Sequence, residues 1–184
     1  LSIEVTVGNR ITTDRWPIQS DNKRYYLQKR PKLFSPGVLS GVQPTKNGVD
    51  TLKFGWITGV NSGVPIISPI LEAENVIPIT AWLPGINPRS AIYYQTKPMK
   101  TEKNLLGIPK ITLWYKPSIQ QSQIIAYLYD LDKFGIGKLI SHAPISRYHD
   151  LPGNFIVTEF ELMMTAHRIP KGHRLALAFG TYDV

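Results

Sequence analysis

The chain of 184 residues contains no cysteine. Disulfide bonds and thiolate metal sites are therefore excluded, and a cytoplasmic location is favoured over an oxidising compartment. No apolar run approaches the ~20 residues that a membrane-spanning helix needs, and the start of the chain alternates polar and apolar residues instead of forming a signal-peptide core. We expect no membrane partner. Because the chain does not begin with methionine, we read it as a piece of a longer polypeptide.

Long amphipathic helices are also missing from the pattern. Instead, 15 prolines and 14 glycines separate short runs rich in β-branched and aromatic residues, which is typical of a β-sandwich or barrel. The length fits one domain, residues 1–184, in which folding removes roughly 70% of the unfolded chain's surface from water. The predicted strands are 3–7, 52–56, 91–95, 111–116, 124–129, 138–141, 155–164 and 173–179.

The last predicted strand has two different faces. In it His173, Leu175, Leu177 and Phe179 alternate with Arg174, Ala176 and Ala178, as residues on opposite sides of a strand do. Proline and glycine at 170 and 172 precede this run, and turn residues in that position set the direction of a strand.

A nucleophile elbow of the form G-x-S-x-G is absent. Ser40 and Ser62 each follow a glycine by three residues, at Gly37 and Gly59, so the leading glycine lies one place too far back. The pattern also indicates no parallel sheet to carry such an elbow. We interpret both serines as loop residues and predict no catalytic residue in this chain.

The histidines lack the spacing of metal ligands. His142, His149, His167 and His173 form neither H-x-x-x-H nor H-x-H, and no cysteine can assist them. We expect His167 and His173 to approach each other across the turn between them in a structural role, with His173 orienting the last strand.

Aspartates near residue 130 allow two interpretations. Asp130, Asp132 and the more distant Asp150 could form an acid–base pair or a calcium loop, but the later acidic ligands of an EF-hand loop are missing. Aspartate in a turn usually binds its own backbone amides. We therefore predict structural turn aspartates, no metal and no cofactor.

Positive charge is uneven along the chain, which has a formal net charge of +8. Residues 1–32 carry seven Lys or Arg against three acids, and residues 97–116 carry five against one. A basic surface can bind nucleic acid, but no aromatic RNP motif or G-x-x-G clamp is evident. We predict a solvated face or a docking face for another domain, and no nucleic-acid partner.

The segment 63–88 is apolar, interrupted by prolines, and ionised only at Glu72 and Glu74. Such a connection either folds over the core or covers a neighbouring domain. Ile70, Trp82 and Pro84 are our candidates for interdomain docking.

Aromatic residues supply an alternative function. Trp56, Trp82 and Trp114, together with nine tyrosines, could form a platform on which sugar rings stack. Aromatic residues on strands are more often core residues than binding residues. We therefore keep a stand-alone carbohydrate-binding or protein-interaction module only as the alternative prediction.

Several short motifs occur in a characteristic order and spacing. G-I-P at 107–109 precedes an alternating run, L-Y-D-L-D-K-F-G spans 128–135, and R-I-P-K-G-H-R-L-A-L spans 168–177, while R-W-P at 15–17 stands near the start. Together they resemble the C-terminal domain of X-Pro dipeptidyl-peptidases and cocaine-esterase-like (CocE/NonD) serine hydrolases. The residues that carry this resemblance are Trp16, Pro17, Gly107, Asp130, Gly135, Pro170, Gly172, His173 and Arg174.

The resemblance implies an all-β, jelly-roll β-sandwich similar to galactose-binding domains. It also implies a non-catalytic accessory domain whose partner is the α/β-hydrolase catalytic domain of the same polypeptide; homo-oligomerisation stays open. The whole enzyme would cleave an ester or amide through an activated serine, and its catalytic groups would lie outside residues 1–184. The predicted strands at 124–129 and 155–164 also contain apolar spacing that fits a helix, through residues 124, 125, 128 and 131 and through residues 162, 163 and 166. Aromatic and β-branched enrichment, together with the resemblance, favours strands in both places.

Overall fold

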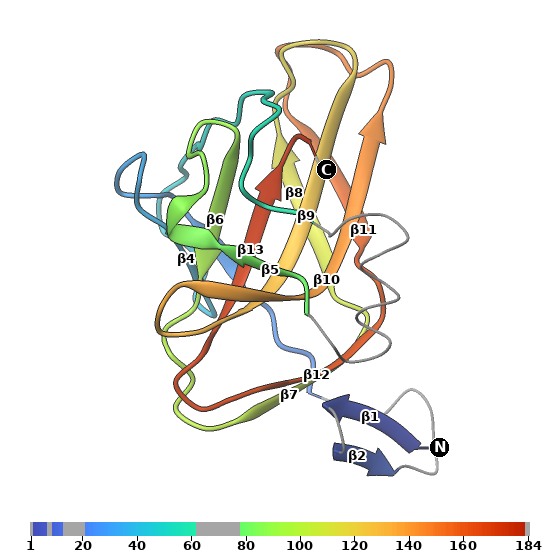
Figure 1. Ribbon diagram of the computed structural model, residues 1–184. Coiled ribbons are helices and arrows are strands. Elements are labelled where there is room, and N and C mark those ends of the chain that lie inside the picture. Colours follow the sequence, from blue (N-terminus) through green and yellow to red (C-terminus); the bar gives the residue numbers. More distant parts are fainter. Residues whose placement is uncertain (1, 7–8, 13–20, 62–77, 183–184) are drawn as a thin grey trace.

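The computed structural model describes residues 2–6, 9–12, 21–61 and 78–182, which form thirteen strands and one short 3₁₀ helix (Figure 1). The strands and the helix are β1 (Ser2–Thr6), β2 (Asn9–Thr12), β3 (Tyr26–Gln28), β4 (Gly37–Ser40), β5 (Thr80–Trp82), η1 (Leu83–Gly85), β6 (Ala91–Gln95), β7 (Lys103–Gly107), β8 (Lys110–Tyr115), β9 (Ser122–Leu131), β10 (Ile136–Arg147), β11 (Ile156–Glu161), β12 (Thr165–Ile169) and β13 (Arg174–Gly180). In the part of the chain that is described, no helix is long and apolar enough to cross a membrane.

A seven-stranded sheet forms the body of the domain. Its strand order is β3-β4-β6-β13-β9-β10-β5, and neighbours are antiparallel except for β4 and β6. The last strand of the chain, β13, lies at the centre between β6 and β9 (Figure 1). The C-terminal run therefore completes the middle of the sheet by pairing with two strands that lie far from it in the sequence.

The two different faces that alternation predicts for β13 are present, and the structure covers both of them. Ala176 and Ala178 belong to one core cluster, whereas Leu175, Leu177 and Phe179 belong to the other. The first cluster contains the small residues of β13 beside the large rings of Tyr127 and Tyr129 on β9. Small side chains thus leave room for neighbouring aromatic rings on one face, and large apolar side chains fill the other.

Two further antiparallel pairs, β8–β11 and β7–β12, make the second layer. Ile111, Leu113 and Phe160 of the first pair and Leu105 and Ile169 of the second pack in the same core cluster as Leu175 and Leu177. The expected all-β jelly-roll sandwich is confirmed. The second core cluster fills the space between the large sheet and these two pairs. The first cluster lies on the other face of the large sheet, with Val60, Leu83 and Ile86.

The strand predicted at 52–56 is wrong. The Lys53 amide donates to the Arg89 carbonyl at 2.7 Å, but this segment forms no strand. The rings of Phe54 and Trp56 are exposed and contact each other, with centroids 5.6 Å apart, and Trp56 also contacts Tyr182 at 4.9 Å. Because these apolar side chains pack on one another at the surface, their alternation does not indicate a pleated strand.

Boundaries also differ elsewhere. The strand expected at 155–164 ends at Glu161, and the one expected at 138–141 extends over twelve residues, Ile136–Arg147. The ambiguous run at 124–129 is part of β9, a ten-residue strand. Strands of three to five residues, β2 to β5, β7 and β12, have too short an apolar pattern to be predicted.

Candidate functional site

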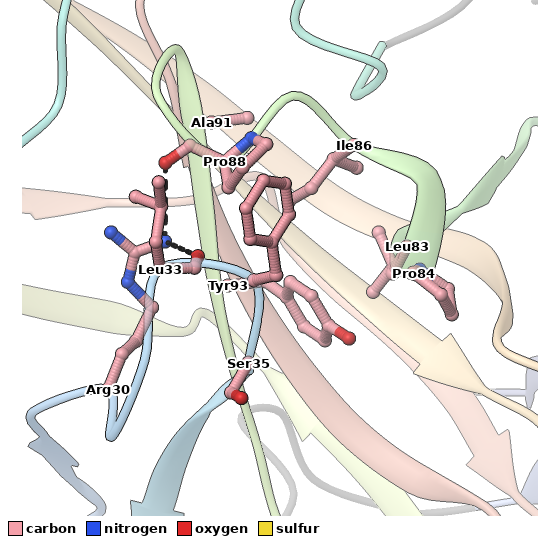
Figure 2. Close-up of a pocket in the computed structure, with 10 residues that line it drawn as sticks. Arg30, Leu33, Ser35, Leu83, Pro84, Ile86, Pro88, Ala91 and Tyr93 are labelled. Carbon is pink, nitrogen blue, oxygen red and sulfur yellow. Dashed lines mark hydrogen bonds between the residues drawn. The ribbon is translucent and has the colours of Figure 1, made fainter.

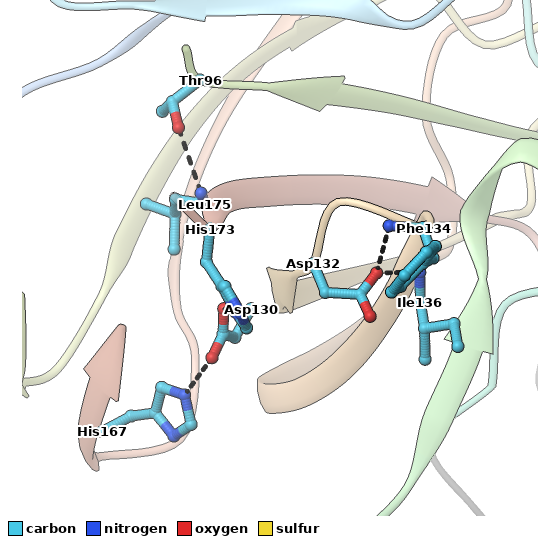
Figure 3. Close-up of polar contacts among 8 residues, drawn as sticks. All are labelled: Thr96, Asp130, Asp132, Phe134, Ile136, His167, His173 and Leu175. Carbon is cyan, nitrogen blue, oxygen red and sulfur yellow. Dashed lines mark hydrogen bonds and ion pairs between the residues drawn. The ribbon is translucent and has the colours of Figure 1, made fainter. Parts of the chain in front are cut away.

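Asp130 is the centre of a buried polar cluster (Figure 3). Its Oδ1 lies 2.8 Å from Nδ1 of His173, and its Oδ2 lies 3.0 Å from Nε2 of His167. The carboxylate is 6% exposed near the end of β9, His167 lies in the middle of β12, and His173 comes directly before β13. One carboxylate therefore joins three separate strands and satisfies its own buried oxygens.

The prediction that Asp130 binds the backbone of its own turn is wrong. Asp130 lies within β9, and the turn begins two residues later. Asp132 takes that role: its Oδ1 accepts hydrogen bonds from the amides of Phe134 and Ile136, each at 2.8 Å (Figure 3). His167 and His173 do approach each other, but through a shared carboxylate contributed by another hairpin, which local spacing does not reveal.

This cluster lacks the geometry of a metal centre. The ring nitrogens point at the carboxylate oxygens instead of toward a common space, and no group of His, Asp and Glu in the described residues is arranged to hold a metal ion. The hydrogen bonds instead hold the entry of β13 to β9.

The two serines have different outcomes. Ser40 lies at the end of β4 instead of in a loop, and its Oγ accepts a hydrogen bond from the Val42 amide at 3.0 Å. Ser62 lies outside the described residues.

Apart from Asp130, which lies within β9, the signature residues on the described part of the chain lie at turns or at the ends of strands. Gly107, Gly135 and Gly172 have φ angles of 114°, 85° and 87°, which L side chains adopt at a cost. The Pro170 carbonyl accepts a hydrogen bond from the His173 amide at 3.2 Å. Arg174 pairs with Leu131 of β9 in the ladder. Trp16, Pro17 and Ile70 lie outside the described residues.

Trp82 is fixed in place and yet 62% exposed. Its indole Nε1 donates to the Phe134 carbonyl at 3.3 Å. In the β5–β10 ladder, Trp82 lies opposite Ile136. A Cβ on Gly85 would collide with the indole ring, and one on Gly135 would lie 2.5 Å from Pro84 Cγ. Two glycines thus allow Trp82 and Pro84 to pack closely against the turn.

Trp56, Trp82 and Trp114 are all exposed, at 68%, 62% and 65%. The expectation that strand aromatics are core residues is therefore wrong for Trp82 and Trp114, which lie on β5 and β8 with their side chains on uncovered faces. Alternation identifies two faces of a strand but does not say which of them another layer covers.

Asp150 forms a second polar cluster that sequence reasoning missed. The Tyr115 hydroxyl donates to its Oδ2 at 2.5 Å, and Arg147 contributes Nε and Nη2 at 3.2 and 3.1 Å from Oδ1. The hydrogen bond from Tyr115 is the main cause that holds the pKa of Asp150 below its ordinary value, and the Arg147 charge adds to it. Burial, with this hydrogen bond, raises the pKa of Tyr115. The cluster ties the end of β8 to the end of β10 and to the loop that follows it.

A third cluster anchors the long N-terminal loops. Arg30 Nε lies 3.3 Å from Asp50 Oδ1, and the Tyr94 hydroxyl donates to Asp50 Oδ2 at 2.7 Å. Arg30 Nη1 also donates to the carbonyls of Leu33 and Pro88 at 3.1 and 3.3 Å (Figure 2). Burial is the main cause that raises the pKa of Tyr94, with its bond to Asp50 next.

A small hollow lies beside the third cluster. Figure 2 shows it between the loop that carries Arg30 and Leu33, the helix η1 and Tyr93 of β6. Its volume of about 20 Å³ suits a water molecule. A substrate needs far more room, since ligand pockets are about 300–1,000 Å³.

The polar clusters of the described residues thus join strands and loops within a β-sandwich. The chain belongs to the X-Pro dipeptidyl-peptidase C-terminal non-catalytic domain family, whose model matches residues 2–182. That family is a non-catalytic C-terminal domain of hydrolases. No curated protein matches the sequence significantly.

Solved structures similar to this chain include hydrolases. They include an alpha-amino acid ester hydrolase (16% identical, TM-score 0.72, 96% of this chain and 32% of that one) and an aminopeptidase from the marine sediment archaeon Thaumarchaeota archaeon (13%, 0.69, 98% and 32%). A CocE/NonD family hydrolase from Staphylococcus aureus is also similar (8%, 0.60, 96% and 31%). At these identities the similarity shows the fold, and the chain spans about a third of each structure.

Proposed function

We propose that this domain is the accessory part of a larger serine hydrolase. It packs on the α/β-hydrolase catalytic domain of the same polypeptide and on its cap, and it helps to shape the substrate pocket. Support comes from the family match and from structural relatives about three times as long. The whole enzyme would cleave an ester or amide bond. One such reaction is the release of X-Pro dipeptides from the N-termini of peptides. A cytoplasmic location stays a prediction.

In such an enzyme an activated serine attacks the acyl carbon, an acyl-enzyme forms, and water releases the product while an oxyanion hole holds the tetrahedral intermediate. All of those groups would belong to the catalytic domain. The contribution of this domain is therefore positional: it holds the catalytic domain and cap in a fixed relation, which determines how accurately the substrate is placed.

The observation that carries the proposal is the Trp82 surface, defined as Trp82, Pro84, Phe134 and Ile136. Its indole is held by a hydrogen bond and by two close glycine contacts, but 62% of the residue is exposed. Phe134 is 68% exposed and lies beneath Lys133, whose Nζ is 4.9 Å from the ring centroid. An immobile aromatic residue loses little entropy on binding, and such residues are typical of interface hot spots.

Neighbouring chemistry agrees with this assignment. The surface combines a rigid aromatic residue, a proline and an aliphatic residue with a lysine at its margin, as an apolar interface centre with a polar rim does. Part of it also lies in the predicted apolar segment 63–88. The described end of that segment, residues 78–88, contains β5, η1 and both docking candidates, Trp82 and Pro84.

The test uses the full-length enzyme with Trp82→Glu. Burial of a carboxylate against an apolar partner surface costs free energy, so we expect a lower thermal midpoint and a lower kcat/KM. The matched control is Trp114→Glu, since Trp114 is equally exposed, at 65%, on a different sheet. Unchanged stability and activity in Trp82→Glu, or equal losses in both variants, would refute the docking role.

A second measurement separates the domain from its enzyme. The purified 184-residue chain should show no turnover of X-Pro or simple ester substrates above buffer, whereas the full-length polypeptide should hydrolyse at least one of them. Turnover by the chain alone that co-purifies through several columns would contradict a non-catalytic role.

A further inference from the structure

The outward face of the β8–β11 pair carries a regular ladder of side chains. Antiparallel register places Trp114 opposite Val157, Thr112 opposite Glu159 and Lys110 opposite Glu161. One step beyond the paired residues, Lys116 Nζ lies 5.9 Å from the Phe155 ring centroid. We call these eight residues the outer ladder: Lys110, Thr112, Trp114, Lys116, Phe155, Val157, Glu159 and Glu161.

Every residue of the outer ladder is exposed, and the intervening residues of both strands face inward. Trp114, Phe155 and Val157 are exposed by 65%, 63% and 51%. One apolar rung, Trp114–Val157, and one cation–π rung, Lys116–Phe155, therefore lie next to two polar ones. Large apolar side chains grouped on an uncovered sheet face are unusual enough to indicate an interaction site.

The backbone under this face is rigid. Ile111, Leu113 and Phe160 belong to the core cluster between the layers. Tyr115, at the aromatic end of β8, donates to the buried Asp150. A fixed support matters because rings that are already immobile lose less entropy when a ligand binds.

The polar rungs offer hydrogen-bonding groups at the level of the rings. The Thr112 hydroxyl donates to Glu159 Oε1 at 3.1 Å, and Lys110 Nζ lies 2.7 Å from Glu161 Oε1. A carboxylate accepts several hydrogen bonds, so both glutamates keep free acceptor positions after these contacts, and ammonium groups keep free donors. Charged acceptors form the stronger hydrogen bonds with hydroxyl groups.

The size of the outer ladder limits what can bind it. Four rungs on two strands span about 20 Å by 10 Å, on the order of 200 Å². A stable protein–protein interface needs about 800 Å² from each partner. A second copy of the chain or a protein domain would therefore find too little surface here, whereas a short, narrow ligand would be covered along its length.

We infer that the outer ladder binds a carbohydrate, as an extended oligosaccharide of pyranose units lying along the strands. The C–H face of one ring stacks on Trp114 and that of a neighbour on Phe155, and equatorial hydroxyls donate to Glu159 and Glu161. Flat apolar rings beside a few placed polar groups are what an amphipathic sugar ring requires. This inference does not depend on the docking role of the Trp82 surface.

The test is affinity electrophoresis of the full-length polypeptide in native gels that contain hydroxyethyl cellulose, xylan, galactomannan or soluble starch. We expect retardation in at least one gel, and Trp114→Ala should raise the Kd about ten-fold or more. Phe155→Ala should weaken binding in the same gel. The control Trp82→Ala removes an equally exposed indole from the other surface and should bind as the parent does.

Each other outcome overturns the inference. Mobility unchanged in all four gels, or equal weakening by Trp114→Ala and Trp82→Ala, would show that the outer ladder is not the carbohydrate site. If Trp114→Ala instead lowers the sedimenting mass, a second copy covers this face; if it lowers the thermal midpoint of the enzyme, the catalytic domain does. The docking proposal is judged separately, from the stability and activity of Trp82→Glu.

Discussion

His173 Nδ1 lies 2.8 Å from Asp130 Oδ1, although 43 positions separate the two residues. The contact fixes the entry of the central strand β13 against the end of β9. Because His167 of β12 binds the other oxygen of the same carboxylate, the two layers of the sandwich are joined at this point.

We predict that Asp130→Ala destabilises the domain by about 1–3 kcal/mol or more, because two imidazoles then lose their acceptor in a buried position. The measurement is urea denaturation of the 184-residue chain. The control is Asp132→Ala, which removes two hydrogen bonds to exposed turn amides and should cost about 1 kcal/mol. Equal losses in the two variants would show that the buried cluster contributes nothing special.

Removal of Arg30 should also be costly. Its side chain and that of Asp50 are 6% and 10% exposed, and breaking a buried pair by removing one partner typically costs about 3–5 kcal/mol. Arg30→Met keeps much of the side-chain volume and isolates the charge. Tyr94→Phe removes a single hydrogen bond to the same carboxylate, so its smaller loss in unfolding free energy serves as the comparison.

Gly135→Ala tests the packing of the turn beneath Trp82. At this position φ is +85° and a Cβ would lie 2.5 Å from Pro84 Cγ, so backbone strain of about 1–3 kcal/mol is joined by a steric clash. Gly153→Ala is the matched control, since its φ is +83° but no atom lies within 4 Å of the added Cβ. We expect thermal unfolding to show the larger loss for Gly135→Ala; losses of equal size would mean that the contact with Pro84 is unimportant.

The Asp150 cluster should make stability depend on pH. The pKa of the Asp150 carboxyl group in the folded chain lies below the ordinary 3.8. The unfolded chain therefore binds a proton at Asp150 more readily than the folded chain does. The stabilisation is therefore present above the unfolded pKa and is lost as pH falls through the folded one.

Tyr115→Phe removes the main cause of that lowered pKa. We expect this variant to be less stable at neutral pH and to lose less unfolding free energy than the parent when the pH is lowered below about 4. Denaturant titrations at several pH values measure the difference between the two chains, in which the other carboxylates cancel. Parallel stability–pH curves would contradict the role assigned to Tyr115.

Local patterns predicted much of this fold. The alternation from 173 to 179 correctly described a strand with two different faces, and the runs at 91–95, 111–116 and 124–129 each became a strand. Turn residues such as Gly135 and Gly172 have the positive φ that makes glycine favourable there. The motifs that carried the family resemblance were sufficient to identify the family, because their order along the chain is a property of sequence alone.

Other features depended on contacts between distant segments. The sequence placed Asp130 in a turn, yet its partners come from residues 37 and 43 positions away. The Asp150 cluster was not predicted because its partner Tyr115 lies 35 positions earlier in the sequence. Trp114 resembled a core residue because alternation is the same for a covered and an uncovered face. Sequence therefore determined the longer strands, several turns and the family, because these depend on local patterns and their order. Tertiary structure decided which charges meet and which aromatic faces remain exposed, because these depend on contacts between distant segments.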